Sequence, residues 1–184
     1  MKDMGVGQVL NIDLPYESRG LLPTSKRYDN YYGENRWGAT NNISNAIGQG
    51  EILMTPLQMA NLAALIANRG YYIEPHLLRG TKGETDRDWQ SISHKRINSK
   101  VDIVHFNTVA NAMEKVVSNG TAGRARIEGI SVCGKTGTSQ NPHGEDHAVF
   151  IAFAPKDKPT IAIATIIENI GGGGTWAAPT ASLM

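Results

Sequence analysis

Residues 135–138 carry the side chains with the clearest capacity for chemistry in this sequence. Lys135, Thr136, Gly137 and Thr138 place one fixed cation, two hydroxyls and a glycine within four positions. They lie in a stretch whose residues alternate as those of a strand do, so we expect them at the end of a buried strand. Glycine permits close approach of another backbone, and a strand edge can pair with an extended ligand. The combination suits a peptide-like substrate that carries a carboxylate.

Taken alone, the Lys-Thr-Gly triplet is a weak signal. A triplet of this composition arises by chance in roughly one chain of this length in a few tens. A strand with a charged end and no further role would look the same. The elements around the triplet must therefore decide what it does.

Composition and charge limit the classes of function that this chain can serve. Its 184 residues, 40% hydrophobic and 19% charged, suffice for one domain with a core or for a piece of a larger one. The net charge of +1 leaves no basic surplus for a phosphate backbone, so we expect no nucleic-acid partner. No apolar run reaches the roughly 18 residues that span a bilayer. The chain as given is therefore expected to be soluble.

Two helices and three strands are predicted around the triplet. Thr55 is a candidate N-cap, with Pro56 in the first helical position, Gln58 completing a capping box and Gly70 as the stop signal. A second helix is expected within residues 101–119, followed by Gly120. The expected apolar faces are Met59, Leu62, Ala63 and Ile66 in the first helix, and Phe106, Val109, Ala110, Met113, Val116 and Val117 in the second.

The predicted strands cover Ile127–Ser139, His147–Ala154 and Thr160–Glu168. The last two are nearly continuous apolar runs, so both faces of their sheet must be covered. The short connection between them predicts an antiparallel hairpin. Residues 11–24 are expected as turns and extended segments, and residues 178–184 as the start of a helix. The fold class is thus α/β in the α+β sense, an antiparallel sheet of three C-terminal strands packed with helices.

Several long blocks, in order and nearly end to end, resemble the penicillin-binding transpeptidases. The likeness is strongest to the elongation-type class B enzymes of the penicillin-binding protein 2 group. The blocks are NIDLPYESRGLLPT, AIGQGEILMTPLQMANLAALIANRG, EPHLL, NGTAGRARIEGISVCGKTGTSQN and FIAFAPKDKPTIAIATIIEN. The resemblance implies part of the fold shared with serine β-lactamases. It also implies that residues 1–184 are the C-terminal portion of a transpeptidase domain.

The chemistry that the resemblance implies is serine acyl transfer at the D-Ala-D-Ala end of a peptidoglycan stem peptide, with β-lactams as mimics. Lys135 would orient the substrate, the hydroxyls of Thr136 and Thr138 would hold its carboxylate, and Gly137 would lie against it. The backbone N–H of Thr138 would be an oxyanion donor, whose loss typically costs about 10²- to 10³-fold in rate. No cofactor is implied.

Two of the three motifs that this family needs are missing from the sequence. It contains no Ser-x-x-Lys, and the nearest pattern, from Ser131 to Lys135, has one residue too many. A Ser-x-Asn at Ser139–Asn141 follows the Lys-Thr-Gly instead of preceding it, and we interpret it as coincidence. The chain alone is therefore expected to be catalytically incomplete, without nucleophile, second oxyanion donor or membrane anchor.

The resemblance also implies a setting for the parent protein. Its expected place is the bacterial cytoplasmic membrane with this domain in the periplasm, beside a membrane glycosyltransferase of the elongation machinery. In this family the strand matching Thr160–Glu168 pairs with a strand from the N-terminal part. Because unpaired apolar edges recruit other chains, we expect self-association through residues 160–168.

Four other features were weighed for chemistry. Cys133, the single cysteine, could be a nucleophile beside Lys135, although a small buried strand residue is the favoured interpretation. His143, Glu145, Asp146 and His147 could hold zinc, but a polar connection between strands is favoured.

The glycines from Gly171 are interpreted as a flexible loop, not a phosphate site. Tyr28, Tyr31 and Tyr32 could stack on a ligand or serve no function. Tyr28 also begins a β-lactamase-like YDN triplet at residues 28–30.

Two alternative functions stay open at this point. The chain could be part of a β-lactamase-like penicillin sensor, although the blocks around Thr55 and Gly120 argue against it. It could also be a non-catalytic module that binds peptides along the strand edge at Lys135.

Overall fold

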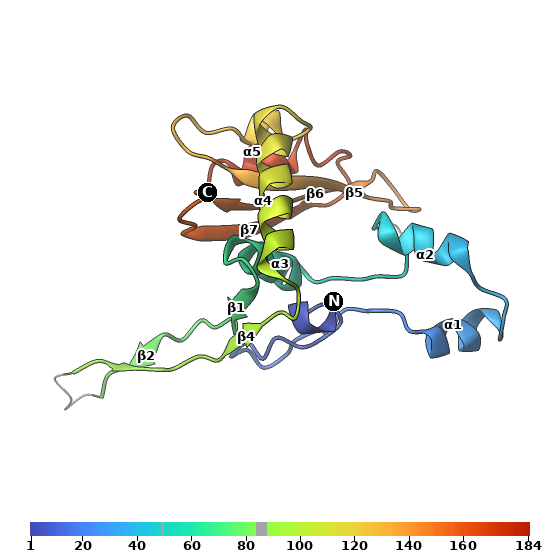
Figure 1. Cartoon of the computed structure of the whole chain (residues 1–184), viewed down its shortest axis with the longest axis horizontal. Helices are drawn as coiled ribbons and strands as arrows, with labels where there is room; N and C mark the ends of the chain where they lie inside the picture. The colour runs from blue at the N-terminus through green and yellow to red at the C-terminus, as the bar shows by residue number, and fades with distance from the viewer. Residues whose placement is uncertain (49, 84–87) are drawn as a thin grey trace.

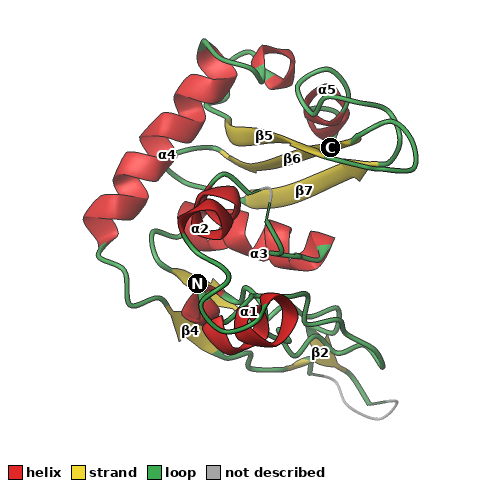
Figure 2. Ribbon diagram, turned by 90° about the vertical axis from the view of Figure 1, so that its right-hand side faces the viewer, coloured by secondary structure: helices red, strands yellow, loops and turns green. Residues whose placement is uncertain are grey.

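A three-stranded antiparallel sheet with helices on both faces is the centre of the molecule. The computed structural model describes residues 1–48, 50–83 and 88–184. The sheet has the order β5 (Cys133–Ser139), β6 (His147–Ala154) and β7 (Ile161–Ile167). Helices α3 (Pro56–Ala67) and α4 (Ile103–Ser118) cover one face, and α5 (Ala177–Ala181) covers the other (Figures 1 and 2). The predicted fold class and the antiparallel hairpin are confirmed.

Each face of the sheet has its own apolar core. Phe153 of β6 packs among α3 and α4, and Phe150 of the same strand packs toward α5. Each of these two rings is 1% exposed. Because both faces are covered, β6 alternates between two interiors, which explains why its sequence is apolar throughout.

The capping box of α3 forms as predicted. The Gln58 backbone N–H donates to Thr55 Oγ1 at 3.2 Å, and the Thr55 N–H donates to Gln58 Oε1 at 3.0 Å. The Gln58 amide also donates to the carbonyls of Gln8 and Arg19, at 2.7 and 2.9 Å. Gln58 is 2% exposed, so this side chain joins the N-terminal segment to the helix from inside the protein.

The end and the buried face of α3 differ from the prediction. The helix ends at Ala67, before Gly70, because Arg69 already has a positive φ of 59°. Met59 and Leu62 are only partly buried, whereas Leu65 is fully buried. The apolar face was misplaced because nearly every side of this helix is apolar.

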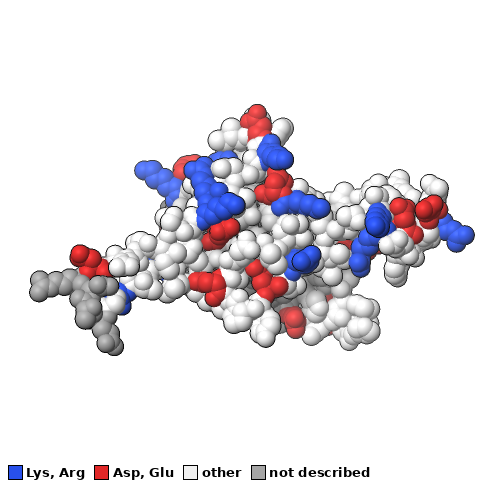
Figure 3. All heavy atoms as spheres, turned by 90° about the horizontal axis from the view of Figure 1, so that it is seen from below, with Lys and Arg blue, Asp and Glu red and all other residues white. Residues whose placement is uncertain are grey.

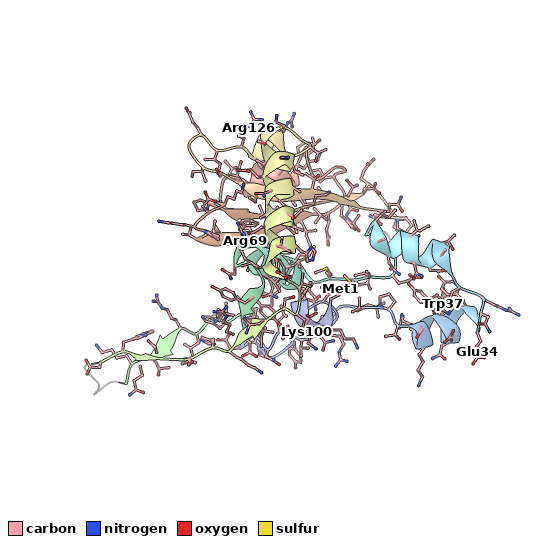
Figure 4. All side chains as sticks on the ribbon, viewed as in Figure 1. Met1, Glu34, Trp37, Arg69, Lys100 and Arg126 are labelled. Carbon is pink, nitrogen blue, oxygen red and sulfur yellow. The ribbon has the colours of Figure 1, made fainter. Side chains whose placement is uncertain are left out.

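Arg69 joins three elements at the end of α3 (Figure 4). Its guanidinium donates to the Ile66 and Ala67 carbonyls at 3.0 and 2.7 Å, which caps the helix. It also donates to Asn107 of α4 at 3.0 Å and to the carbonyl of Lys156 after β6 at 3.1 Å. One charged side chain therefore ties both helices to the sheet.

Helix α4 lies within its predicted bounds, with a narrower buried face. Phe106, Ala110, Met113 and Val117 are buried. Val109 is 42% exposed, so its assignment to the buried face was wrong.

The first fifty residues contain three short helices that the sequence did not predict, η1 (Lys2–Met4), α1 (Ser25–Tyr32) and α2 (Ala39–Ala46). Tyr28 is the one buried residue of α1 among those described, and α2 has none. Helices without a buried face lack the periodicity by which a sequence reveals them. Between η1 and α1, residues 11–24 form turns and extended chain, as expected.

A long hairpin extends from the end of α3 (Figure 1). It consists of β1 (Tyr71–Ile73), β2 (Gly80–Thr81), β3 (Gln90–Ser91) and β4 (Arg96–Asn98), paired β1 with β4 and β2 with β3. Residues 84–87, between β2 and β3, lie outside the described part. The Asp13 carboxylate accepts from the backbone N–H groups of Leu77 and Leu78, both at 2.7 Å. These bonds lower the pKa of Asp13.

The strand before the sheet begins later than predicted. Residues 127–132 form a tight turn with an Ile127–Ile130 bridge, preceded by η2 (Gly123–Ala125), and β5 starts at Cys133. At the other side of the sheet, β7 pairs only with β6 among the described residues.

On the face shown in Figure 3, acidic and basic side chains are interspersed. In the part of the chain that the structure describes, no helix is both long enough and apolar enough to cross a bilayer.

Candidate functional site

The Lys-Thr-Gly-Thr residues occupy an edge strand. Within the described residues β5 pairs with β6 alone, so its outer edge is free to pair with an extended ligand. Register partners share a face of the sheet, and Lys135 faces the same side as Ile151, toward α3 and α4. Thr136 pairs with Phe150, and Thr138 lies two residues further on, so both hydroxyls belong to the α5 side.

Lys135 and Thr138 are exposed, as a ligand-binding role requires. The Lys135 ammonium donates to the carbonyl of Thr136 at 2.5 Å, so the cation lies beside the backbone of its own strand. A carboxylate arriving at this edge would find the cation and the Thr138 N–H within one short segment of backbone.

The hydroxyl of Thr136 has a partner that the sequence did not reveal. Thr121, in the loop between α4 and η2, places its Oγ1 2.8 Å from Thr136 Oγ1. Residue 121 lies inside the NGTA block that carries the resemblance. Nothing in the local pattern marks it, because only the packing of α4 on β5 brings it to the strand.

A cavity of about 670 Å³ opens at the end of β5, next to Thr138. Its lining combines the end of the strand with the segment before α3. The described lining residues are Gly48, Gly50, Ile52, Leu53, Thr138, Ser139, Gln140, Asn141, Pro142 and Asp146. Two blocks that are distant in the sequence therefore meet at the candidate site.

Cys133 is not a nucleophile in this structure. It is 0% exposed, and its Sγ donates to the carbonyl of Ala110 at 3.5 Å. Burial raises the pKa of the thiol to about 11, whereas a reactive cysteine needs a lowered pKa. Its interpretation as a small buried strand residue is confirmed.

The polar loop before β6 is occupied by its own hydrogen bonds. Asp146 Oδ1 accepts from the Asn141 N–H at 3.2 Å, and His147 Nδ1 accepts from the Asn169 N–H at 3.1 Å. Throughout the described residues, no three His, Cys, Asp or Glu side chains gather closely enough to hold a metal ion. These hydrogen bonds support the interpretation of this loop as a polar connection between strands.

The tyrosines of α1 serve a local network away from β5 (Figures 1 and 2). The hydroxyls of Tyr28 and Tyr32 donate to the two carboxylate oxygens of Glu51, at 2.6 and 2.7 Å. Tyr31 is 79% exposed. The YDN triplet therefore does not contribute its tyrosine to the candidate site.

The fold and this edge-strand site define a class, the penicillin-binding transpeptidases, and comparison with known proteins agrees. Residues 1–183 match the family described as the penicillin binding protein transpeptidase domain. The chain is 35% identical to the peptidoglycan D,D-transpeptidase MrdA of Acinetobacter baumannii over 96% of its own length and 28% of that protein.

Solved structures show the same fold. The crystal structure of Pseudomonas aeruginosa PBP2 in complex with WCK 5153 has a TM-score of 0.80 and 32% identity, over 98% of this chain and 39% of that one. A structure described as a peptidoglycan synthase complex that coordinates polymerization and crosslinking has a TM-score of 0.79 and 27% identity, over 98% of this chain and 30% of that one. The chain belongs to the penicillin-binding protein transpeptidase family. It spans less than a third of the length of the MrdA relative.

Proposed function

We propose that residues 1–184 are the C-terminal portion of a peptidoglycan D,D-transpeptidase domain and provide its substrate clamp. The observation that carries this proposal is the partly exposed Lys135–Thr138 segment on an edge strand beside a cavity. An edge strand can bind an extended peptide through backbone hydrogen bonds, and a fixed cation selects one that ends in a carboxylate. A stem peptide ending in D-Ala-D-Ala has this form, and a penicillin imitates it.

Within this proposal each residue of the segment has a separate task. Lys135 attracts the terminal carboxylate, and Thr136 and Thr138 donate hydroxyl hydrogen bonds to it. Gly137 lets the substrate backbone lie against the strand. Among the described residues an added Cβ would touch Val149 alone, so the fold itself does not require a glycine at this position. The Thr138 N–H stabilises the oxyanion as the serine attacks.

The serine itself is supplied by the parent protein, since no Ser-x-x-Lys occurs in these 184 residues. The isolated chain is accordingly proposed to be inactive. The parent is proposed to act at the outer side of the bacterial cytoplasmic membrane. There it would work with a glycosyltransferase of the elongation machinery, in keeping with the synthase complex that shares the fold.

The clamp is tested by acylation of the upstream-extended protein from the same gene. Replacing Lys135 with Ala should lower the second-order rate of acylation by penicillin G about ten- to a hundredfold, the range of a hydrogen bond to a charged group. The matched control is Lys158→Ala, an exposed lysine in the turn between β6 and β7. An unchanged rate in Lys135→Ala would overturn the clamp, and a protein that no penicillin acylates would overturn the proposed function.

A further inference from the structure

The hydroxyls of Thr121 and Thr136 form a pair beside the Lys-Thr-Gly-Thr segment. Their oxygens are 2.8 Å apart, and either hydroxyl can be the donor. Thr136 comes from β5 and Thr121 from the loop after α4, 15 residues earlier in the chain. The pair is therefore made by tertiary packing, and not by the local conformation of the strand.

The glycine-rich segment after β7 holds this loop against the strand. A Cβ on Gly174 would collide with the carbonyl of Thr121 and lie 3.6 Å from Thr136 Cγ2. A Cβ on Gly173 would collide with the backbone carbonyls of Gly137 and Val149. Gly173 and Gly174 are thus packed on the strand, which corrects the interpretation of the whole segment as a flexible loop. The Arg124 guanidinium adds a bond to the carbonyl of Thr175 at 3.3 Å.

The direction of the hydroxyl bond decides whether Thr136 can serve a carboxylate. If Thr136 donates to Thr121, its single hydroxyl proton is engaged in that bond, and Thr136 has no hydrogen left to donate to the carboxylate. If Thr121 donates to Thr136, the Thr136 proton stays available, and the chain of two hydroxyls polarises toward the negative charge. An arriving carboxylate selects the second direction because only that direction gives it a hydrogen bond.

We propose that Thr121 is a positioning residue for substrate binding. Its hydroxyl holds the Thr136 side chain in one rotamer and donates to it, so that Thr136 presents its proton to a carboxylate at the edge of β5. This inference rests on the proposed function for the identity of the ligand. The preorganised rotamer itself is a property of the chain without any ligand.

The first test measures that rotamer in the 184-residue chain by NMR. Three-bond couplings of the Thr136 methyl group should report one fixed χ1 in the native protein. They should report rotamer averaging in Thr121→Val, which keeps the shape of the side chain, and a fixed χ1 again in Thr121→Ser. Thr108→Val, which removes an exposed hydroxyl from α4, is the matched control. Couplings that do not change in Thr121→Val would overturn the inference.

The second test measures carboxylate recognition in the upstream-extended protein. Thr121→Val should slow acylation by penicillin G about two- to tenfold, the range of one net hydrogen bond. Penicillin G methyl ester lacks the free carboxylate. We expect it to acylate Thr121→Val at the same rate as it acylates the unmodified protein. Equal slowing with both compounds would show a general structural defect and overturn the positioning role. A protein that neither compound acylates would refute the proposed function, and the NMR couplings would then decide the inference by themselves.

Discussion

Cys133 shows at the scale of one residue how the fold decides chemistry. The sequence places this thiol two positions before a lysine, which is a plausible setting for a nucleophile. Helix α4 instead covers this end of the strand, and the buried thiol bonds the Ala110 carbonyl. Lys135, two residues further along on the same face of the sheet, is exposed, so the extent of burial and not the side of the strand separates the two side chains.

Burial of this thiol predicts a dependence of stability on pH. The pKa of Cys133 is raised from its ordinary 9.0 to about 11, so the folded protein keeps the thiol proton that the unfolded chain releases. The stabilisation by the neutral thiol is thus complete below pH 9 and declines as the pH rises from 9.0 toward about 11. Urea unfolding of the native chain and of Cys133→Ala should give a difference in free energy that shrinks over this range. A constant difference would contradict the inward position.

Thr121 marks the limit of prediction at the residue scale. The positions of Lys135, Thr136, Gly137 and Thr138 could be predicted because all four belong to one contiguous motif on one strand. Thr121 reaches Thr136 only through the packing of α4 on β5, and the pattern of residues along the sequence does not predict that tertiary contact.

At the scale of elements, sequence patterns predicted those features whose hydrogen bonds join residues close together in the chain. The start of α3 follows from Thr55, Pro56 and Gln58, whose bonds lie within a single turn. Helices α1 and α2 escaped prediction because, within the described residues, α1 buries a single side chain and α2 buries none. The added role of Gln58, which binds the carbonyls of Gln8 and Arg19, also depends on distant chain and had no signature.

The buried hydrogen bonds of Gln58 predict a measurable loss of stability when this residue is replaced. In Gln58→Met the side chain keeps its volume, while the Thr55 N–H and the carbonyls of Gln8 and Arg19 lose their partner inside the protein. The free energy of unfolding should fall by about 3 kcal/mol, because unsatisfied buried polar groups cost about 1–3 kcal/mol each. Urea denaturation measures it. Gln140→Met, at an exposed position, should change stability by less than about 0.5 kcal/mol. Equal effects of the two substitutions would contradict the bridging role.

At the scale of the whole molecule, the edge of β7 predicts self-association. Among the described residues this strand pairs only with β6, and Ile161 at its start is 43% exposed. Sedimentation velocity at micromolar concentration should show species larger than the monomer, which Ile161→Lys reduces by placing a charge at the edge. Ile92→Lys is a matched control, since Ile92 is 40% exposed on the hairpin. A monomer at every concentration, with unprotected amides over residues 160–168, would refute this prediction.

The most direct measurement is intact-mass spectrometry after incubation with excess penicillin G, on the 184-residue chain and on the upstream-extended protein. The chain holds the proposed substrate clamp and no Ser-x-x-Lys. We therefore expect no adduct on the chain and one adduct per molecule on the extended protein, mapped to a serine upstream of Met1. A stoichiometric adduct on a serine within residues 1–184 would contradict the account, because the chain would then contain its own nucleophile.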